Sequence, residues 1–123
     1  MLTRERRLRQ TRDINRVYAK GRPGGAAGLS AKVLPNGLGD SRAVVVVSRK
    51  VSKKAVVRNR IRRRTAALLT SRWATVAAGY DIVVTVREDL SELAGPELEK
   101  RIQQSLTRAG VMTPGRAPKE PDV

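Results

Sequence analysis

The stretch from Arg42 to Arg64 reads RAVVVVSRKVSKKAVVRNRIRRR and decides the fold expected for this chain. Its first part, residues 42–48, is β-branched and apolar on both faces, which predicts a central strand. The segment 52–73 has the length and periodicity of a helix, with Ser52 as its expected N-cap residue. One apolar stripe of that helix can dock on a sheet, and it consists of Val57, Ile61, Thr65 and Leu68.

The residues before this stretch predict a helix and a strand. Residues 11–20 have an apolar face at helical spacing, with Thr11 as the expected N-cap. Gly21 can adopt the left-handed conformation that ends such a helix. Residues 29–35 alternate as a strand does, and an extra short strand is compatible with residues 24–34.

The residues after it predict a second strand at 80–87 and a last helix at 96–109. The apolar positions of that helix are Leu98, Ile102, Leu106 and Ala109. The order of elements predicts an α/β (α+β) two-layer sandwich, in which a small central sheet carries the helices. A chain of 123 residues has room for one domain, expected over residues 1–112, and the Pro-rich end at 113–123 is expected to be a disordered tail.

The net charge of +15 is concentrated in the first two thirds of the chain. Residues 1–80 hold 20 basic and 3 acidic residues, whereas residues 81–123 hold 6 basic and 8 acidic ones. A polyanion relieves the self-repulsion of such a body, so nucleic acid is the first candidate partner and an anionic membrane the second. No apolar run is long enough to span a membrane or to act as a secretory signal, which favours a cytoplasmic protein.

The composition argues against catalysis by the protein itself. The chain has no histidine and no cysteine, which removes the commonest general base, the commonest metal ligands and the thiol nucleophile. The only candidates for a cluster of carboxylates that could hold metal ions are Asp81, Glu88 and Asp89. We interpret Asp81 as the start of a strand and Glu88-Asp89 as a polar turn. We therefore assign no catalytic residue and no metal ligand, and we expect no cofactor to be held tightly by the protein.

The basic helix is the strongest functional signal. Nine of the 17 residues from Ser48 to Arg64 are Lys or Arg, and none is acidic. A face that only aids solubility normally mixes both signs, and a membrane-surface helix would need a larger apolar stripe. RNA is the better partner, because Asn59 adds an acceptor that can meet 2′-hydroxyls or base edges.

The first 16 residues contain a second cluster of arginines, beside an isolated tyrosine. Tyr18 can stack on an unpaired base or pack in the core, and the sequence leaves both readings open. For Ile14 a core position is the simpler interpretation.

The stretch Ser48-Arg49-Lys50 followed by residues 55–63, AVVRNRIRR, closely resembles the arginine-asparagine-arginine helix of the bacterial ribonuclease P protein subunit. Residues 13–18, DINRVY, resemble that family's first helix, and residues 42–48 resemble its central strand. Residues 80–84, and Glu97-Leu98-Glu99 with Leu106, resemble its later strand and last helix. The resemblance runs in collinear order over about residues 2–110.

The resemblance implies a ribosomal-protein-like fold with a left-handed βαβ crossover through the basic helix. It implies an auxiliary subunit of a ribonucleoprotein endonuclease that removes the 5′ leader of precursor tRNA. In that assembly the RNA and its Mg²⁺ ions carry out the cleavage, and no membrane or DNA partner is expected.

The resemblance also assigns two sets of RNA-binding residues. The catalytic RNA would be bound by Arg49, Lys50, Lys53, Lys54, Arg58, Asn59, Arg60, Arg62, Arg63 and Arg64. The leader would lie between the first helix and the sheet, against Arg9, Arg12, Ile14, Arg16, Tyr18 and Lys32.

The loop before the basic helix reads Val51-Ser52-Lys53-Lys54, whereas many members of the family have a Gly-Asn pair in that loop. The chain also departs from the family in the leader groove. Family members usually have further aromatic residues there, whereas Tyr18 is the only one here and Lys32 stands at the strand position. We therefore expect weaker stacking on the leader and relatively stronger contact with its phosphates. The alternative functions are a ribosomal or other structured-RNA-binding protein, and, less favoured, a DNA-binding protein that inserts the basic helix in a groove.

Overall fold

The structure is a computed structural model that describes residues 5–112, and the tail predicted at 113–123 lies outside the described residues. The elements are, in order, α1 (Thr11–Lys20), β1 (Arg22–Ala26), β2 (Leu29–Pro35), β3 (Arg42–Val47), α2 (Ala55–Ser71), the 3-10 helix η1 (Trp73–Thr75), β4 (Tyr80–Val86) and α3 (Gly95–Ala109). The predicted α+β class is confirmed, and β1 supplies the extra short strand.

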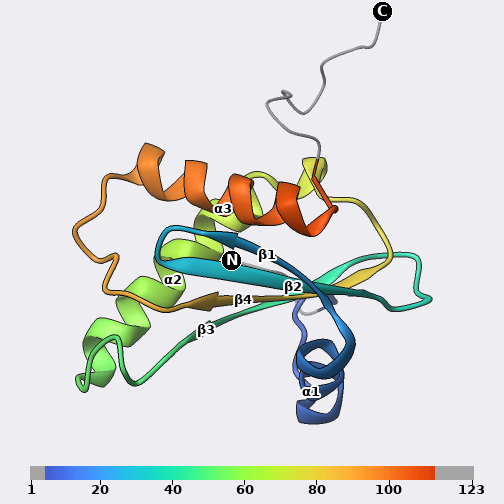
Figure 1. Ribbon diagram of the computed structural model, residues 1–123, viewed down its shortest axis with the longest axis horizontal. Helices are drawn as coiled ribbons and strands as arrows, with labels where there is room; N and C mark the ends of the chain where they lie inside the picture. Colours follow the sequence, from blue (N-terminus) through green and yellow to red (C-terminus); the bar gives the residue numbers. More distant parts are fainter. Residues whose placement is uncertain (1–4, 113–123) are drawn as a thin grey trace, which may run out of the picture.

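The four strands form one mixed sheet in the order β1-β2-β4-β3 (Figure 1). β2 pairs in antiparallel with both β1 and β4, whereas β3 pairs with β4 in parallel. Parallel neighbours need a crossover connection, and α2 supplies it between β3 and β4. The basic helix is therefore held at both ends by adjacent strands.

β3 lies at an edge of the sheet, so the prediction of a central strand at residues 42–48 is wrong. Its apolar composition has a different cause, because side chains cover both of its faces. Ala43 and Val45 belong to the main core, whereas Val44 and Val46 pack on a second cluster on the opposite face. A strand that is apolar on both sides is therefore one whose two faces are covered, and it need not have a neighbouring strand at both edges.

Part of the outer edge of β3 is paired with the segment before α1. The Leu8 N–H donates to the carbonyl of Ala43 at 2.8 Å, and the Ala43 N–H donates to the carbonyl of Arg6, also at 2.8 Å. Leu8 is itself buried, so this short pairing is anchored by packing.

The helices are divided between the two faces of the sheet (Figure 1). α2 and α3 cover one face and enclose the main core, to which they contribute Ile61, Leu69, Leu98, Ile102 and Leu106. α1 lies on the other face, where Val17 packs with Leu8 and Val83. In Figure 1, α1 lies beneath one end of the sheet only, and no other helix formed by residues 5–112 covers this second face.

The helix ends differ from the predicted caps. α1 begins at Thr11 with Gln10 as N-cap, and α2 begins at Ala55 with Lys54 as N-cap, so Thr11 and Ser52 are not the capping residues. Gly21 ends α1 in an extended conformation with φ −73°, not the left-handed one. Its lack of a side chain still matters, because a Cβ at this position would lie 2.5 Å from the Val17 carbonyl oxygen. Gly110 does end α3 in the left-handed region, with φ 92°.

Gly24 of β1 permits the closest approach between the sheet and α3. A Cβ on Gly24 would overlap the backbone of α3 at the carbonyl oxygen of Ser105 and the nitrogen of Ala109. Gly25, the next residue of the same strand, has open space where its Cβ would be. The two glycines therefore form a matched pair for testing how α3 is seated.

We expect Gly24→Ala to lower the free energy of unfolding by about 1–3 kcal/mol, because α3 must move off the strand. Gly25→Ala should change it by no more than about 0.5 kcal/mol. Urea unfolding followed by circular dichroism measures both. Equal stabilities of the two variants would contradict the close approach.

Candidate nucleic-acid interface

The basic helix is docked through the predicted stripe. Ile61 and Thr65 are 1% exposed, Val57 and Leu68 are half-buried, and Leu69 is fully buried beside them. The side of α2 that faces the core is thus apolar apart from Thr65, whose hydroxyl has no hydrogen-bond partner among the described residues, and the cationic sides face solvent.

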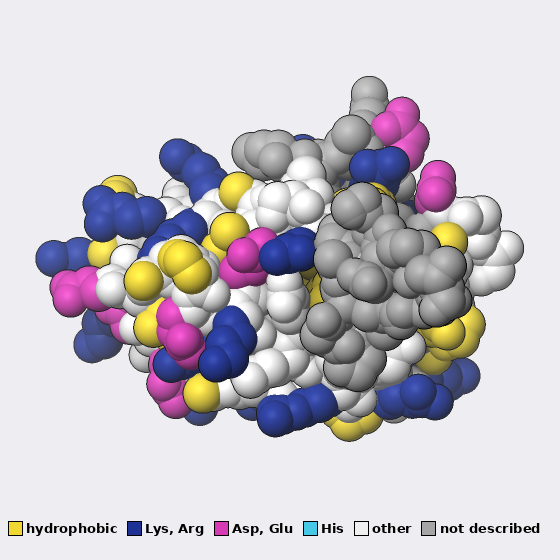
Figure 2. All heavy atoms as spheres, turned by 90° about the horizontal axis from the view of Figure 1, so that it is seen from above, with side chains coloured by type: hydrophobic (Ala, Val, Ile, Leu, Met, Phe, Trp, Pro, Cys, Tyr) yellow, Lys and Arg dark blue, Asp and Glu magenta, His cyan; other side chains and the backbone are white. Residues whose placement is uncertain are grey.

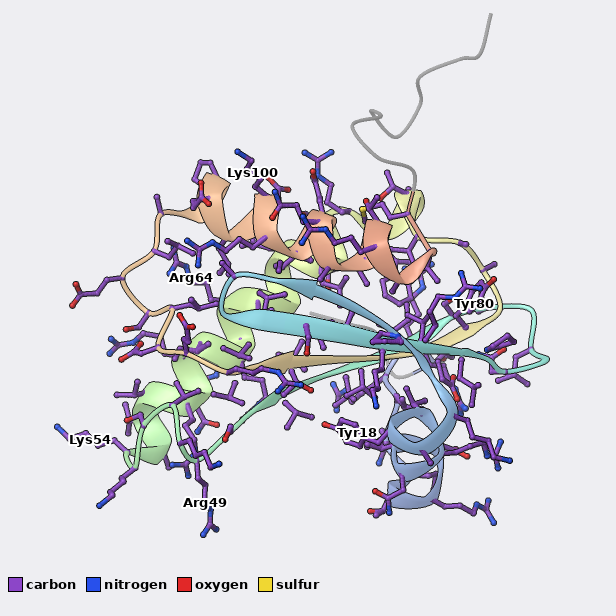
Figure 3. All side chains as sticks on the ribbon, in the orientation of Figure 1. Tyr18, Arg49, Lys54, Arg64, Tyr80 and Lys100 are labelled. Atoms are coloured by element: carbon purple, nitrogen blue, oxygen red, sulfur yellow. The ribbon has the colours of Figure 1, made fainter. Side chains whose placement is uncertain are left out.

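The cations before and along α2 fall into an exposed set and a half-buried set. The exposed set consists of Arg49, Lys50, Lys53, Lys54, Arg60, Arg62 and Arg63. Within residues 5–112, no carboxylate forms an ion pair with any of these seven side chains. Figure 3 shows two of them, Arg49 and Lys54, extending outward at the N-terminal end of α2. The exposed set is therefore an uncompensated cationic surface suited to phosphates.

The half-buried set is bound to the protein. Arg64 donates to three carbonyls of the loop before α3, those of Leu90 at 3.2 Å, Ser91 at 3.0 Å and Leu93. Arg58 donates to the carbonyl of Ser52 at 2.8 Å. These two arginines fasten α2 to its surroundings, so their donors are partly used before any ligand arrives.

The loop between β3 and α2 is ordered by its two serines. The hydroxyl oxygens of Ser48 and Ser52 accept from the backbone N–H groups of Lys50 and Lys54, each at 3.1 Å. Such side-chain turns fix a loop locally. They set the direction in which the lysines leave the chain, and Ser52 has this role in place of the predicted N-cap.

Asn59 is half-buried on α2, between the half-buried Arg58 and the exposed Arg60. Its side-chain oxygen accepts a hydrogen bond from Arg62. The acceptor that the sequence assigned to RNA is thus engaged within the helix, whereas the amide N–H donors have no bond among the described residues.

A second candidate surface lies where α1 meets the uncovered face of the sheet. The Tyr18 hydroxyl is 3.3 Å from the Thr85 hydroxyl, and the Lys32 ammonium donates to the Tyr18 carbonyl at 2.7 Å. The strand register places Lys32 beside Val83, which in turn lies beside Val44, and Ser30 beside Thr85, which in turn lies beside Val46. Tyr18 is 38% exposed, so its ring lies beside the sheet with part of its surface open (Figure 3).

The six predicted leader-binding residues are only partly brought together. Tyr18 and Lys32 are in contact, and Ile14 is half-buried in the cluster with Val17 and Val83. The exposed arginines of this region are Arg9, Arg12 and Arg16. Sequence reasoning missed Thr85, Ser30 and Val46, which no spacing rule connects to α1 because they come from three different strands.

A buried ion-pair network sets the position of α1 on the sheet. Arg42 donates to both oxygens of Asp81, at 2.9 and 2.7 Å, and lies 3.5 Å from the carboxylate of Asp13 on α1. Asp81 is 4% exposed and also accepts from Asn36 at 3.0 Å. The hydrogen bond and the charge of Asp81 raise the pKa of Arg42 above its ordinary value. Arg42 of β3 thus joins α1, through Asp13, to β4, through Asp81.

The outer face of α3 has a different charge pattern. Viewed from that side, acidic and basic side chains are interspersed (Figure 2). Glu99 pairs with Arg72 at 2.8 Å and Glu97 with Arg101 at 3.3 Å. This face has compensated charges and is not suited to a polyanion.

The described residues contain no group of three or more His, Cys, Asp or Glu side chains that could hold a metal ion. In the same part of the chain, no helix is both long and apolar enough to cross a bilayer.

Comparison with known proteins identifies one family. The profile of the family described as Ribonuclease P matches residues 2–110. The ribonuclease P protein component of Roseiflexus castenholzii is 36% identical over 122 residues, which are 98% of each chain. The component from a Pseudanabaena species is 37% identical over 113 residues, covering 91% of this chain and 97% of its own.

Solved structures agree with the sequence comparison. The ribonuclease P protein of Thermotoga maritima superposes with a TM-score of 0.75 at 27% identity, over 83% of this chain and 96% of that one. The Staphylococcus aureus protein has a TM-score of 0.76 at 22% identity, over 87% and 97% of the chains, and supports the fold alone.

The different bonding of neighbouring arginines leads to a prediction about stability. Arg64→Ala removes the donors of three loop carbonyls and should lower the free energy of unfolding by about 1–3 kcal/mol. Arg63→Ala, at an exposed position of the same helix, should change it by less than about 0.5 kcal/mol. Urea denaturation of the two variants distinguishes them, and equal effects would show that Arg64 does not fasten the loop.

Proposed function

The chain belongs to the bacterial ribonuclease P protein family, and on that premise we propose how its two cationic surfaces divide the recognition of RNA. The exposed cations of α2 and of the loop before it bind the catalytic RNA subunit. The groove between α1 and the open sheet face binds the single-stranded 5′ leader of precursor tRNA. The family membership decides against the ribosomal and DNA-binding alternatives.

The observation that carries the proposal is the uncompensated charge of the exposed set on α2. Seven cations lie on one continuous segment, and none has a carboxylate partner within residues 5–112. Phosphates relieve this repulsion and release counterions, which makes binding strong and dependent on salt. The neutralised face of α3 supports the same orientation, because it offers the RNA no comparable attraction.

The groove has a composition suited to a single strand. Tyr18 offers a partly exposed ring, Lys32 offers charge, and Ser30 and Thr85 offer hydroxyls that can meet ribose or base edges. The aliphatic floor of Val44 and Val46 adds contact area without sequence preference. These features support a leader held through one stacking contact and several polar ones.

We assign the chemistry of leader removal to the RNA subunit and its Mg²⁺ ions, and we locate the assembly in the cytoplasm. The first assignment is supported by the absence of histidine and cysteine from the sequence and by the ion pairs that engage Asp81 and Glu99. The protein then acts by binding and orienting, which contributes to rate through position and not through proton transfer.

Reconstitution tests the function. Adding the protein to the ribonuclease P RNA of its own organism at low Mg²⁺ should stimulate cleavage of precursor tRNA at the mature 5′ end. Lys54→Ala should weaken binding to that RNA and reduce the slope of log K against log salt by about 0.7–0.9, the value for one phosphate contact.

Lys100→Ala is the matched control, because Lys100 is an exposed lysine on the outer face of α3 (Figure 3). It should leave the affinity and the salt slope unchanged. The absence of stimulation by the wild-type protein would reject the function, and equal effects of the two lysines would reject the assigned surface.

The leader site is tested through Tyr18. Tyr18→Ala should weaken binding of leader-bearing precursor by about 5- to 150-fold, the equivalent of one base stack, and should not affect binding of mature tRNA. Tyr18→Phe keeps the ring and should retain most of the affinity. An equal loss for precursor and mature tRNA would contradict the assignment of the groove to the leader.

A further inference from the structure

The outer edge of β3 is only partly covered. Ala43 exchanges both of its outward backbone bonds with Arg6 and Leu8. Alternation along a strand directs the N–H and C=O of Val45 to the same side, away from β4. No hydrogen bond from any described residue reaches these groups of Val45. After Leu8 the chain enters α1 on the opposite face, so this pairing does not extend toward Val45.

A cavity of about 290 Å³ lies at this open edge. Its floor is residues 43–45 of β3, and Ala66 of α2 forms an apolar wall. Arg7, Arg62 and Arg63 line it as well, and all three are exposed. None of the three forms an ion pair with a described carboxylate. The cavity therefore combines an apolar slot, the unpaired backbone N–H and C=O of Val45, and three guanidinium groups.

We propose that this cavity is a binding site for one unpaired nucleotide of the RNA subunit, extruded from its helix. The inference rests on the proposed function and adds to it a site that is bordered by Arg62 and Arg63, two of the exposed cations of α2. The base occupies the slot between Ala66 and β3, where its edge meets the Val45 peptide group. The flanking phosphates lie on the three arginines.

The chemistry favours an unpaired nucleotide over other ligands. Each base has neighbouring donor and acceptor atoms on its pairing edge, which can bond to one peptide N–H and one C=O only when the base is unpaired. A duplex does not fit a slot of this volume. A peptide strand can add to a sheet edge, but three arginines that have no carboxylate partner among the described residues would require it to be strongly acidic.

Filling the slot tests the proposal without changing charge. Ala66→Leu places a larger side chain in the cavity, and Ala67→Leu makes the same change one residue further, at an exposed position outside it. Ala66→Leu should weaken binding to the RNA subunit by about 5- to 150-fold, whereas Ala67→Leu should be within about twofold of wild type. Equal affinities of the two variants overturn the proposal, whatever else the edge may bind.

Cross-linking provides a readout that does not depend on tolerance of the larger side chain. The chain has no cysteine, so Ala66→Cys and Ala67→Cys can each be labelled uniquely with a photoreactive azide. The probe at 66 should join to one or two unpaired nucleotides, and the probe at 67 should give a different pattern. Cross-links from 66 spread along a stem, or identical to those from 67, overturn the site.

The two proposals fail in different ways. If the wild-type protein neither binds the RNA subunit nor stimulates cleavage, the proposed function is rejected. If it does both, and the 66 and 67 variants behave alike, only the nucleotide site is rejected.

Discussion

The structure depends on docking one side of a helix that repels itself. Seven exposed cations lie on α2 and the loop before it, with no carboxylate partner in the described part of the chain, and like charges at helical spacing oppose helix formation. Burial of Ile61 and Leu69 and the bonds of Arg64 to three loop carbonyls oppose that repulsion. The sheet has to supply the apolar face on which this side of α2 is buried. The charge that defines the interface is thus tolerated because the opposite side of the same helix is fixed.

Much of the fold can be predicted from the sequence, since α1, β2, β4 and α3 lie close to where periodicity places them. The position of β3 at the edge of the sheet cannot be predicted in this way. An apolar pattern indicates that the faces of a strand are covered, but it does not indicate how many strands lie beside it. β1 contains Gly24 and Gly25 and has almost no side-chain pattern to detect. Its strand is specified by the fit of Gly24 against α3, which is a tertiary constraint.

The candidate site can be predicted in composition but not in detail. A run of cations marks the segment, yet nothing local distinguishes Arg63, which is exposed, from Arg64, which is bound to the loop before α3. That difference depends on residues about 27 positions away. Asp81 illustrates the same limit, because its sequence context indicates only the start of a strand, whereas the structure makes it the partner of Arg42.

β3 connects the two surfaces, and this gives the fold its functional logic. Ala43 and Val45 contact the core beneath α2, while Val44 and Val46 form part of the floor beside α1. The surface proposed for the catalytic RNA and the surface proposed for the leader therefore lie on opposite sides of the sheet, with α2 on one face and α1 on the other. Arg42, at the start of that strand, forms ion pairs with Asp13 of α1 and Asp81 of β4. These ion pairs fix the position of α1 relative to β3, the strand that leads into α2. A small body built this way can hold a substrate strand at a constant position relative to a bound RNA, which is the contribution that the proposed function requires of the protein.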